Sequence, residues 1–396
     1  MAGLESRHPA PDGGILLPSI DPTTEETQPV IEARTDVIGS LLRPPELLEA
    51  QRLHAAGELS AEELVLAEDR AVDWALALQE EAGLQVVTDG EMRRLSFQSQ
   101  LPAAVDGFAS WDLDAFLWGD WHSEELGDLS VSRPPIAVVG KLRRRRFLSV
   151  AELAYARERT DRILKVTLPS PSLFANFWDP DRSTGAYPDL EDFLGDVAAI
   201  LRDEADELVR LGARYLQLDA PHYPLLVDPT WRDFYASRGW PAERWLELGL
   251  ELDRYVIGER PGLTWGFHLC RGNQASRWLV SGGYEWLAER IFPTLRVERL
   301  LLEYDDARSG GFEPLAHTPE ETTCVLGLVT TKSGRRETVG ELSARIREAA
   351  RVVPLERLAL SPQCGFATSV VGNALTVEDE LAKLRTIVET ARAVWG

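Results

Sequence analysis

Short apolar segments alternate with longer helical segments along most of the chain, and this alternation restricts the fold more than any other sequence feature. Segments of strand length that end in polar residues lie at 35–40, 85–91, 165–171, 214–219, 263–270, 299–306, 324–332 and 357–364. Between them, apolar residues recur at helical spacing, most clearly at 61–81, 190–211, 243–258, 339–352 and 378–395. Gly83 and Gly212 stand where two of these helices are expected to end.

The alternation predicts a parallel sheet whose strands are joined by helices. Eight repeats over about 360 residues favour one (β/α)8 TIM barrel over an open doubly wound sheet. No Gly-x-Gly-x-x-Gly or Gly-x-x-x-x-Gly-Lys loop indicates a nucleotide-binding fold. We therefore predict a catalytic TIM barrel over residues 34–396, preceded by a flexible arm, rich in Pro, Gly, Glu and Thr, over residues 1–33.

The interval between the second and third predicted strands, about residues 96–162, is too long for a simple crossover. It contains several tryptophans among acidic residues, including Trp121 beside His122, and then the basic run 141–146. We interpret it as an insertion that covers the barrel mouth like a lid. Its basic residues are more typical of a surface hairpin, solvated or neutralising the acidic body, than of a binding patch.

Charge and hydropathy exclude several classes of partner. The chain of 396 residues carries 64 acidic and 42 basic side chains, which gives a formal charge of −22. Only the basic run could form a positively charged surface that binds phosphate groups, so we expect neither a nucleic-acid partner nor binding to a membrane. The sequence shows no long apolar span and no secretory leader, and we expect a cytoplasmic protein. It leaves open whether the chain forms a homo-oligomer.

Three cysteines are too few for a disulfide framework and are available for metal binding or chemistry. His268 and Cys270 stand at i and i+2 on an apolar strand, so their side chains point to one face and supply half of a tetrahedral zinc site. Cys364 ends the eighth predicted strand and offers a third soft ligand, since the functional groups of a TIM barrel lie where its strands end. Cys324 has no matching polar partner at a strand end, and we expect it to pack in the core.

Six sequence motifs occur along the chain in the same order as in the cobalamin-independent methionine synthase family, and the chain resembles the catalytic C-terminal barrel of that family. The motifs are Val37-Ile38-Gly39-Ser40, Thr88-Asp89-Gly90-Glu91 followed by Arg93 and Arg94, Leu216-Gln217-Leu218-Asp219-x-Pro221, His268-x-Cys270, Glu303 and Pro362-x-Cys364-Gly365. They extend from about residue 35 to the end of the chain.

This resemblance implies a Zn²⁺ site with His268, Cys270, Glu303 and Cys364 as ligands. It also implies transfer of an alkyl group, typically methyl, from a donor such as a folate or a methylcorrinoid to a zinc-activated small-molecule thiol. A coordinating thiol is deprotonated, whereas a free thiol is mostly protonated at neutral pH. The implied activity is that of a homocysteine S-methyltransferase in methionine biosynthesis.

The resemblance further implies that Ser40 and Glu91 hold the carboxylate and amino groups of homocysteine, with Asp219 near the amino group as a candidate catalytic residue. Because acids at a barrel mouth often pair with cations, an equally supported alternative is that Glu91 and Asp219 bind Arg93, Arg94 or other cations at the barrel mouth.

Two further groups are weaker candidates for substrate binding. Phe177 and Trp178 follow the third strand, where the family places an aromatic platform for a pterin ring, although such a pair is commonly part of the core. His222 lies just beyond Asp219 and is a candidate for lining the mouth, although a lone histidine there is more often a wall residue.

Three departures from the family pattern bear on the substrate. The chain has the length of one barrel, whereas the full-length enzyme has an additional N-terminal barrel that helps to bind folate. Asp219-Ala220-Pro221 replaces an Asp-Glu-Pro sequence. Lys332 stands where the family has a histidine that protonates the leaving group. Lys332 is a candidate catalytic acid if its pKa is depressed, or else binds an anionic group of the substrate.

These departures leave other functions open. A related zinc enzyme could join another thiol to another electrophile, such as coenzyme M to an epoxide, where a cation would meet the sulfonate. A uroporphyrinogen-decarboxylase-like barrel is disfavoured, because that chemistry has no use for two cysteines at the functional face. A third alternative is a non-catalytic barrel that binds zinc or thiols.

Overall fold

The computed structural model describes residues 31–109, 117–133 and 136–396. The predicted arm over residues 1–33 lies outside the described residues except for its last three. Of these, Ala33 is buried, and its carbonyl oxygen accepts a hydrogen bond from Arg299 Nη2 (3.0 Å). Arg299 Nη1 also donates to the carbonyl oxygen of Ile31 (3.2 Å). The chain is therefore attached to the barrel from residue 31 onward.

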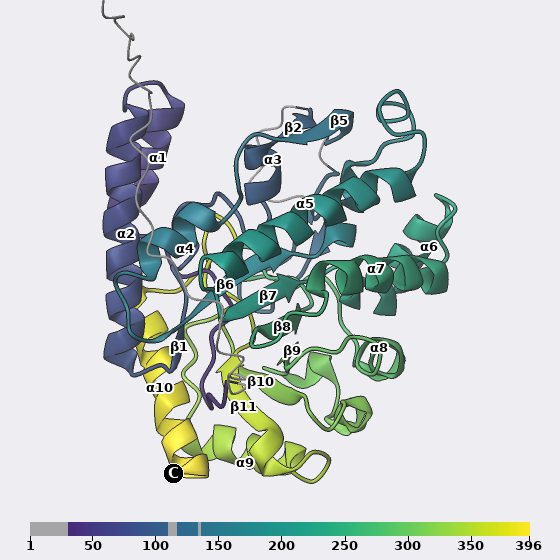
Figure 1. Cartoon of the computed structure of the whole chain (residues 1–396). Helices are drawn as coiled ribbons and strands as arrows, with labels where there is room; N and C mark the ends of the chain where they lie inside the picture. The colour runs from purple at the N-terminus through teal and green to yellow at the C-terminus, as the bar shows by residue number, and fades with distance from the viewer. Residues whose placement is uncertain (1–30, 110–116, 134–135) are drawn as a thin grey trace, which may run out of the picture.

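The main sheet has seven parallel strands in the order β1-β6-β7-β8-β9-β10-β11, which curve into the barrel of a TIM fold (Figure 1). Their bounds are β1 Val86–Val87, β6 Ile163–Pro169, β7 Tyr215–Asp219, β8 Thr264–Leu269, β9 Arg299–Glu303, β10 Thr323–Val329 and β11 Leu358–Pro362. The predicted fold class is confirmed. Each predicted strand from the third to the eighth overlaps an observed one, because runs buried on both faces read as continuous apolar segments.

The predicted first strand, residues 35–40, does not form a regular strand. Thr35 instead makes one parallel bridge to Leu360 of β11, and the backbone N–H of Asp36 donates to the carbonyl oxygen of Leu360 (3.0 Å). On its other side, the hydroxyl of Thr35 accepts a hydrogen bond from the backbone N–H of Gln85 (3.1 Å). This segment thus fills the eighth position of the barrel between β11 and β1.

Helices surround the strands (Figure 1). They are α1 Pro45–Ala55, α2 Ala61–Ala82, α3 Gln100–Ala104, α4 Val150–Ala156, α5 Leu190–Arg210, α6 Pro229–Ala236, α7 Ala242–Ile257, α8 Glu285–Ile291, α9 Val339–Ala349 and α10 Val377–Trp395, with short 3₁₀ helices at Pro171–Phe177, Pro224–Val227, Ala307–Ser309, Glu313–His317 and Leu355–Arg357. Ser60 and Glu63 form a capping box at the start of α2, and Gly83 ends it in the left-handed conformation (φ +89°).

The insertion after β1 forms two small antiparallel sheets, β2 (Val105–Phe108) with β5 (Val138–Arg144) and β3 (Gly119–Trp121) with β4 (Leu129–Val131). It is attached to the loop after β8, because the backbones of His122 and Trp278 exchange two hydrogen bonds (2.8 and 3.0 Å). The insertion therefore lies over the mouth of the barrel, as the lid interpretation predicts. Near its end, α4 packs against α2 and α5 as part of the outer helical layer.

The barrel interior contains a buried ion cluster centred on Asp36. Its carboxylate lies 2.8 Å from Lys165 Nζ and 3.0 Å from Arg299 Nε, and it accepts a hydrogen bond from the hydroxyl of Tyr215 (2.7 Å). Burial opposes the charge of Asp36, but Lys165 and Arg299 hold its pKa below the usual value. The cluster fixes the segment that closes the barrel to β6, β7 and β9.

Replacement of Asp36 by Asn should lower the free energy of unfolding by about 3–5 kcal/mol, because Lys165 and Arg299 would remain buried without a carboxylate. Urea denaturation measures the difference. Glu49→Gln is the matched control, since Glu49 and Arg52 form an ion pair with both side chains more than half exposed, and its loss should leave stability nearly unchanged. Wild-type stability of Asp36→Asn would contradict this account of barrel closure.

Candidate metal centre and pocket

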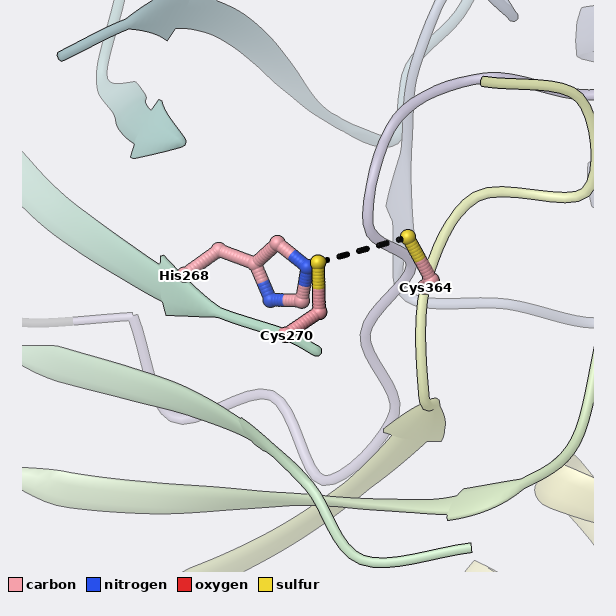
Figure 2. A group of neighbouring side chains, drawn as sticks. All are labelled: His268, Cys270 and Cys364. Atoms are coloured by element: carbon pink, nitrogen blue, oxygen red, sulfur yellow. Dashed lines mark hydrogen bonds between the residues drawn. The ribbon is translucent and has the colours of Figure 1, made fainter. Parts of the chain in front are cut away.

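Three predicted metal ligands come together at the ends of β8 and β11. The ligand atoms of His268, Cys270 and Cys364 all lie within 4.8 Å of one another, and all three residues are buried. Figure 2 shows the imidazole and the two thiols pointing toward one another, and the two sulfur atoms are 3.9 Å apart. The Cys364 thiol donates a hydrogen bond to the Cys270 sulfur, which lowers the pKa of Cys270 and raises that of Cys364.

The hydrogen bonds of His268 fit a metal ligand. Its Nδ1 lies 3.1 Å from the carbonyl oxygen of Leu301, which requires a proton on Nδ1 and leaves a lone pair on Nε2. That Nε2 atom is buried and has no hydrogen-bond partner within the described part of the chain. A carbonyl bonded to one ring nitrogen is the usual support for a histidine that binds metal through the other. The donor set therefore fits zinc.

Glu303, the fourth predicted ligand, lies outside this group of three. Its Oε1 is 2.9 Å from Lys332 Nζ and 3.3 Å from Arg308 Nη2, and its Oε2 accepts a hydrogen bond from the backbone N–H of Arg271 (2.6 Å). Lys332 also pairs with Asp305 (3.2 Å). Burial opposes the charge of Lys332, but these carboxylates raise its pKa, which is the opposite of what the general-acid interpretation requires.

One pocket is lined by the three ligand residues and by three of the predicted substrate-binding residues. Ser40, Glu91 and Asp219 line it together with His268, Cys270 and Cys364. The other lining residues are Ile38, Gly39, Phe97, Gln98, Leu117, Trp121, Pro221, Gly272, Asn273, Gln274, Gly365 and Thr368. Lys332 and Glu303 are not among them. Thus acidic and thiol groups share one apolar-walled space, as expected for a small-molecule site.

Glu91 is held in an unusual conformation at the wall of this pocket. Its φ angle is +56°, a region that non-glycine residues seldom occupy, and its backbone N–H donates to the carboxylate of Asp89 (2.9 Å). Its Oε1 lies 3.2 Å from Arg94 Nη1 and accepts a hydrogen bond from Thr167 Oγ1 (2.7 Å). Its Oε2 is buried and unpartnered among the described residues. One oxygen is therefore anchored and the other is available.

Asp219 stands at the end of β7 and does not pair with either arginine that the sequence offered as an alternative. Its Oδ1 accepts a hydrogen bond from Gln217 Nε2 (2.8 Å). Burial raises the pKa of Asp219 to about 7. Of the two arginines, Arg94 pairs with Glu91 and Glu152, whereas Arg93 pairs with acids of α2. Glu91 thus has the arginine partner that the ion-pair alternative expects, whereas Asp219 has no ion pair with Arg93 or Arg94 within the described residues.

The three weaker candidates do not line the pocket. Phe177 is fully buried and packs edge-on against Phe108, with ring centroids 5.1 Å apart. Trp178 Nε1 donates to the carbonyl oxygen of Tyr187 (3.0 Å). His222 Nε2 lies 2.7 Å from the hydroxyl of Ser172, and burial lowers its pKa to about 3. These positions match the core and wall interpretations better than a pterin platform.

The sequence analysis missed much of the pocket wall, including Phe97, Gln98, Asn273, Gln274 and Thr368. They come from loops that carry no periodic pattern. Trp121 could be anticipated, because the tryptophans of the insertion suggested a cover. Gly272 is needed beside it, since a Cβ atom there would lie 2.8 Å from the Trp121 ring.

Asn273 joins three loops around the pocket. Its Nδ2 donates to Thr331 Oγ1 (3.0 Å) and to the carbonyl oxygen of Gly365 (3.0 Å), which follows Cys364. Its Oδ1 accepts a hydrogen bond from Asn373 Nδ2 (3.1 Å). The loops after β8, β10 and β11 are thus fixed to one buried amide, and two of them carry ligand cysteines.

Fold and site together define a TIM-barrel protein with a thiol-rich candidate metal centre at the ends of its strands. The family model described as "Cobalamin-independent synthase, Catalytic domain" matches residues 33–239 and 284–393. The chain therefore belongs to this family. His268 and Cys270 lie between the two matched ranges, so their assignment depends on the geometry above.

Individual relatives agree with the family assignment. The uncharacterized protein YxjH of Bacillus subtilis is 35% identical over 91% of this chain and 94% of its own length. A methionine synthase of Pyrococcus abyssi is 28% identical over 84% of this chain and 86% of its own length. A crystal structure of a Listeria monocytogenes protein assigned to vitamin-B12-independent methionine synthase has a TM-score of 0.69 and 26% identity, and the match covers 93% of this chain and all of that one.

A search of the described residues for membrane spans finds no helix with the length and apolar character needed to cross a bilayer.

Replacement of Asn273 by Asp should lower the free energy of unfolding by about 1–3 kcal/mol, because a carboxylate oxygen would face the carbonyl of Gly365 instead of a donor. Urea denaturation and amide hydrogen exchange of the loop at 363–368 provide the measurements. Unchanged stability together with unchanged exchange would show that Asn273 does not hold these loops.

Proposed function

We propose that this protein is a zinc-dependent S-methyltransferase that transfers a methyl group to the thiol of homocysteine. The observation that carries the proposal is the convergence of His268, Cys270 and Cys364 in the wall of a pocket that Glu91 and Asp219 also line. Membership of the cobalamin-independent synthase family and the methionine synthase relatives support the same reaction.

His268, Cys270 and Cys364 would hold the zinc ion. When bound, zinc lowers the pKa of a coordinating thiol, so that its sulfur attacks the methyl donor as a thiolate. The side chains of this centre stand on strand ends or directly after them, and Asn273 fixes the loop of Cys364 through Gly365. Such rigid support keeps the donor atoms in place for repeated turnover.

The acidic residues of the pocket suit the amino group of homocysteine. Glu91 Oε2 is buried and unpartnered in the described part of the chain, so an incoming ammonium group would satisfy it. Asp219 lies in the same pocket wall and supplies a second acceptor. Ser40 offers a hydroxyl to the carboxylate of the amino acid. We assign these three residues to substrate binding.

The lid residues provide the apolar part of the site. Trp121, Leu117 and Phe97 line the pocket together with the polar groups, and Trp121 is 2% exposed. Apolar walls exclude water from the reacting sulfur and strengthen the charged hydrogen bonds to the amino acid.

Metal analysis of the purified protein should find about one zinc per chain. Cys364→Ser should lose that zinc, because a hydroxyl is a poor ligand for this ion. Cys324→Ser is the matched control: Cys324 is equally buried, but it bonds Thr318 in the wall of the barrel and should not affect the metal. Equal zinc content in wild type and Cys364→Ser would disprove the assigned centre.

Methionine formation tests the reaction itself. Purified protein is incubated with homocysteine and either methyltetrahydrofolate or methylcobalamin, and methionine is quantified. Glu91→Gln should raise the KM for homocysteine by roughly tenfold or more, because a charged hydrogen bond becomes a neutral one. Absence of methionine with both donors, from protein that contains zinc, would count against homocysteine methylation.

A further inference from the structure

We propose that Glu152 is a positioning residue for substrate binding: it neutralises Arg94, so that Glu91 keeps an unbalanced negative charge for the amino group of homocysteine. Glu152 stands on α4, near the end of the insertion, and neither Glu152 nor Arg94 is among the residues that line the pocket. The inference rests on the proposed function, since it takes Glu91 as the group that binds the substrate ammonium.

Arg94 lies between two buried carboxylates and binds them unequally. Its Nε atom lies 3.2 Å from each carboxylate oxygen of Glu152, and its Nη2 atom lies 2.7 Å from Oε2 of the same residue. Its ion pair with Glu91 is a single contact, from Nη1 to Oε1 at 3.2 Å. Because a guanidinium group binds most strongly through two of its nitrogens, Glu152 is the main counter-ion of Arg94.

Burial makes the number of charges in this group decisive. The side chains of Glu91 and Arg94 are each 2% exposed and that of Glu152 is 7% exposed, so water and salt screen their interactions little. One cation between two carboxylates leaves one negative charge. Without Glu152, Arg94 and Glu91 would form a neutral pair, and the attraction of the pocket for an ammonium group would fall.

The remaining negative charge is presented to the pocket at one oxygen of Glu91. Thr167 Oγ1 donates to Glu91 Oε1 (2.7 Å) and accepts a hydrogen bond from Arg94 Nη1 (2.7 Å), so hydroxyl and guanidinium both hold Oε1. The other oxygen, Oε2, is buried and has no partner in the described part of the chain. An ammonium group would supply both the missing hydrogen bond and the opposite charge.

The insertion both supplies Glu152 and holds it. Gln100 Nε2, on α3, donates to Glu152 Oε2 (3.0 Å) and to Ser149 Oγ (2.6 Å). Arg94 Nη2 also donates to the carbonyl oxygen of Thr167 on β6 (3.2 Å), so the ion pair joins the insertion to the barrel wall. The insertion therefore sets the charge of the substrate site from outside the pocket, in addition to covering the mouth.

Thiol binding with and without an amino group tests this role. Calorimetry on zinc-loaded protein compares homocysteine with 4-sulfanylbutanoate, which has the same thiol and carboxylate but no amino group. Glu152→Gln should weaken homocysteine binding about tenfold and 4-sulfanylbutanoate binding less than about twofold, because only homocysteine carries the charge that Glu91 attracts. Burial raises the pKa of Asp89 to about 7, so titration at pH 8 keeps this neighbouring carboxyl ionised.

Glu68→Gln is the matched control, with circular dichroism to confirm the folding of each variant. Glu68 pairs with the adjacent Arg93 (3.3 Å), and Arg93 also pairs with Asp69. The control therefore removes an acid from the same region without changing the partners of Arg94, and neither thiol should bind differently.

The double variant Arg94→Gln/Glu152→Gln separates charge balance from structural support. It removes the cation together with its counter-ion, so homocysteine affinity should return to within about threefold of wild type. Unchanged homocysteine affinity in Glu152→Gln, equal losses for both thiols, or a double variant as weak as Glu152→Gln would overturn the inference and leave the proposed function intact. Wild-type protein that binds homocysteine no more tightly than 4-sulfanylbutanoate would overturn the assignment of Glu91 to the amino group, and this inference with it.

Discussion

The buried carboxylate of Asp36 is the contact on which the rest of the structure depends. It closes a barrel whose eighth segment has few backbone hydrogen bonds, by binding Lys165 and Arg299 in the interior. The same network reaches the site: Lys165 Nζ donates to Gln217 Oε1 (2.7 Å), and Gln217 Nε2 donates to Asp219 (2.8 Å). Because Lys165 binds the amide oxygen of Gln217, the amide nitrogen is oriented toward Asp219 and donates a hydrogen bond to its carboxylate. The network that closes the barrel therefore also orients the hydrogen-bond donor to Asp219 in the pocket.

Most of the fold could be predicted because the barrel repeats one pattern. Apolar runs buried on both faces identified β6 to β11, and amphipathic spacing located α2, α5, α7, α9 and α10. The prediction of a strand at 35–40 was wrong. The segment has strand-like composition, but the side chain of Asp36 turns inward, and its hydrogen bonds replace part of the backbone pairing. No local pattern reports such a contact, because its partners lie more than a hundred residues away.

The residues of the candidate site that stand on strands or at strand ends could be predicted from the sequence, whereas those on loops could not. His268 and Cys270 follow from the strand period, and Cys364 from its place at the end of a strand. The contact between Glu303 and Lys332 could not be read from the sequence, although β9 and β10 are neighbours and Glu303 pairs in register with Gly327. Register places the Lys332 loop beside Glu303, but only side-chain geometry shows that the lysine binds the carboxylate.

Zinc K-edge absorption spectroscopy, recorded without and with homocysteine, tests the central claim most directly. Two thiolates and one imidazole from the protein predict two sulfur neighbours and one nitrogen neighbour before the thiol is added, and a third sulfur neighbour afterwards. Coenzyme M in place of homocysteine shows whether the pocket selects the amino acid. A spectrum that gains no sulfur neighbour with either thiol would contradict a thiol-activating zinc centre in this barrel.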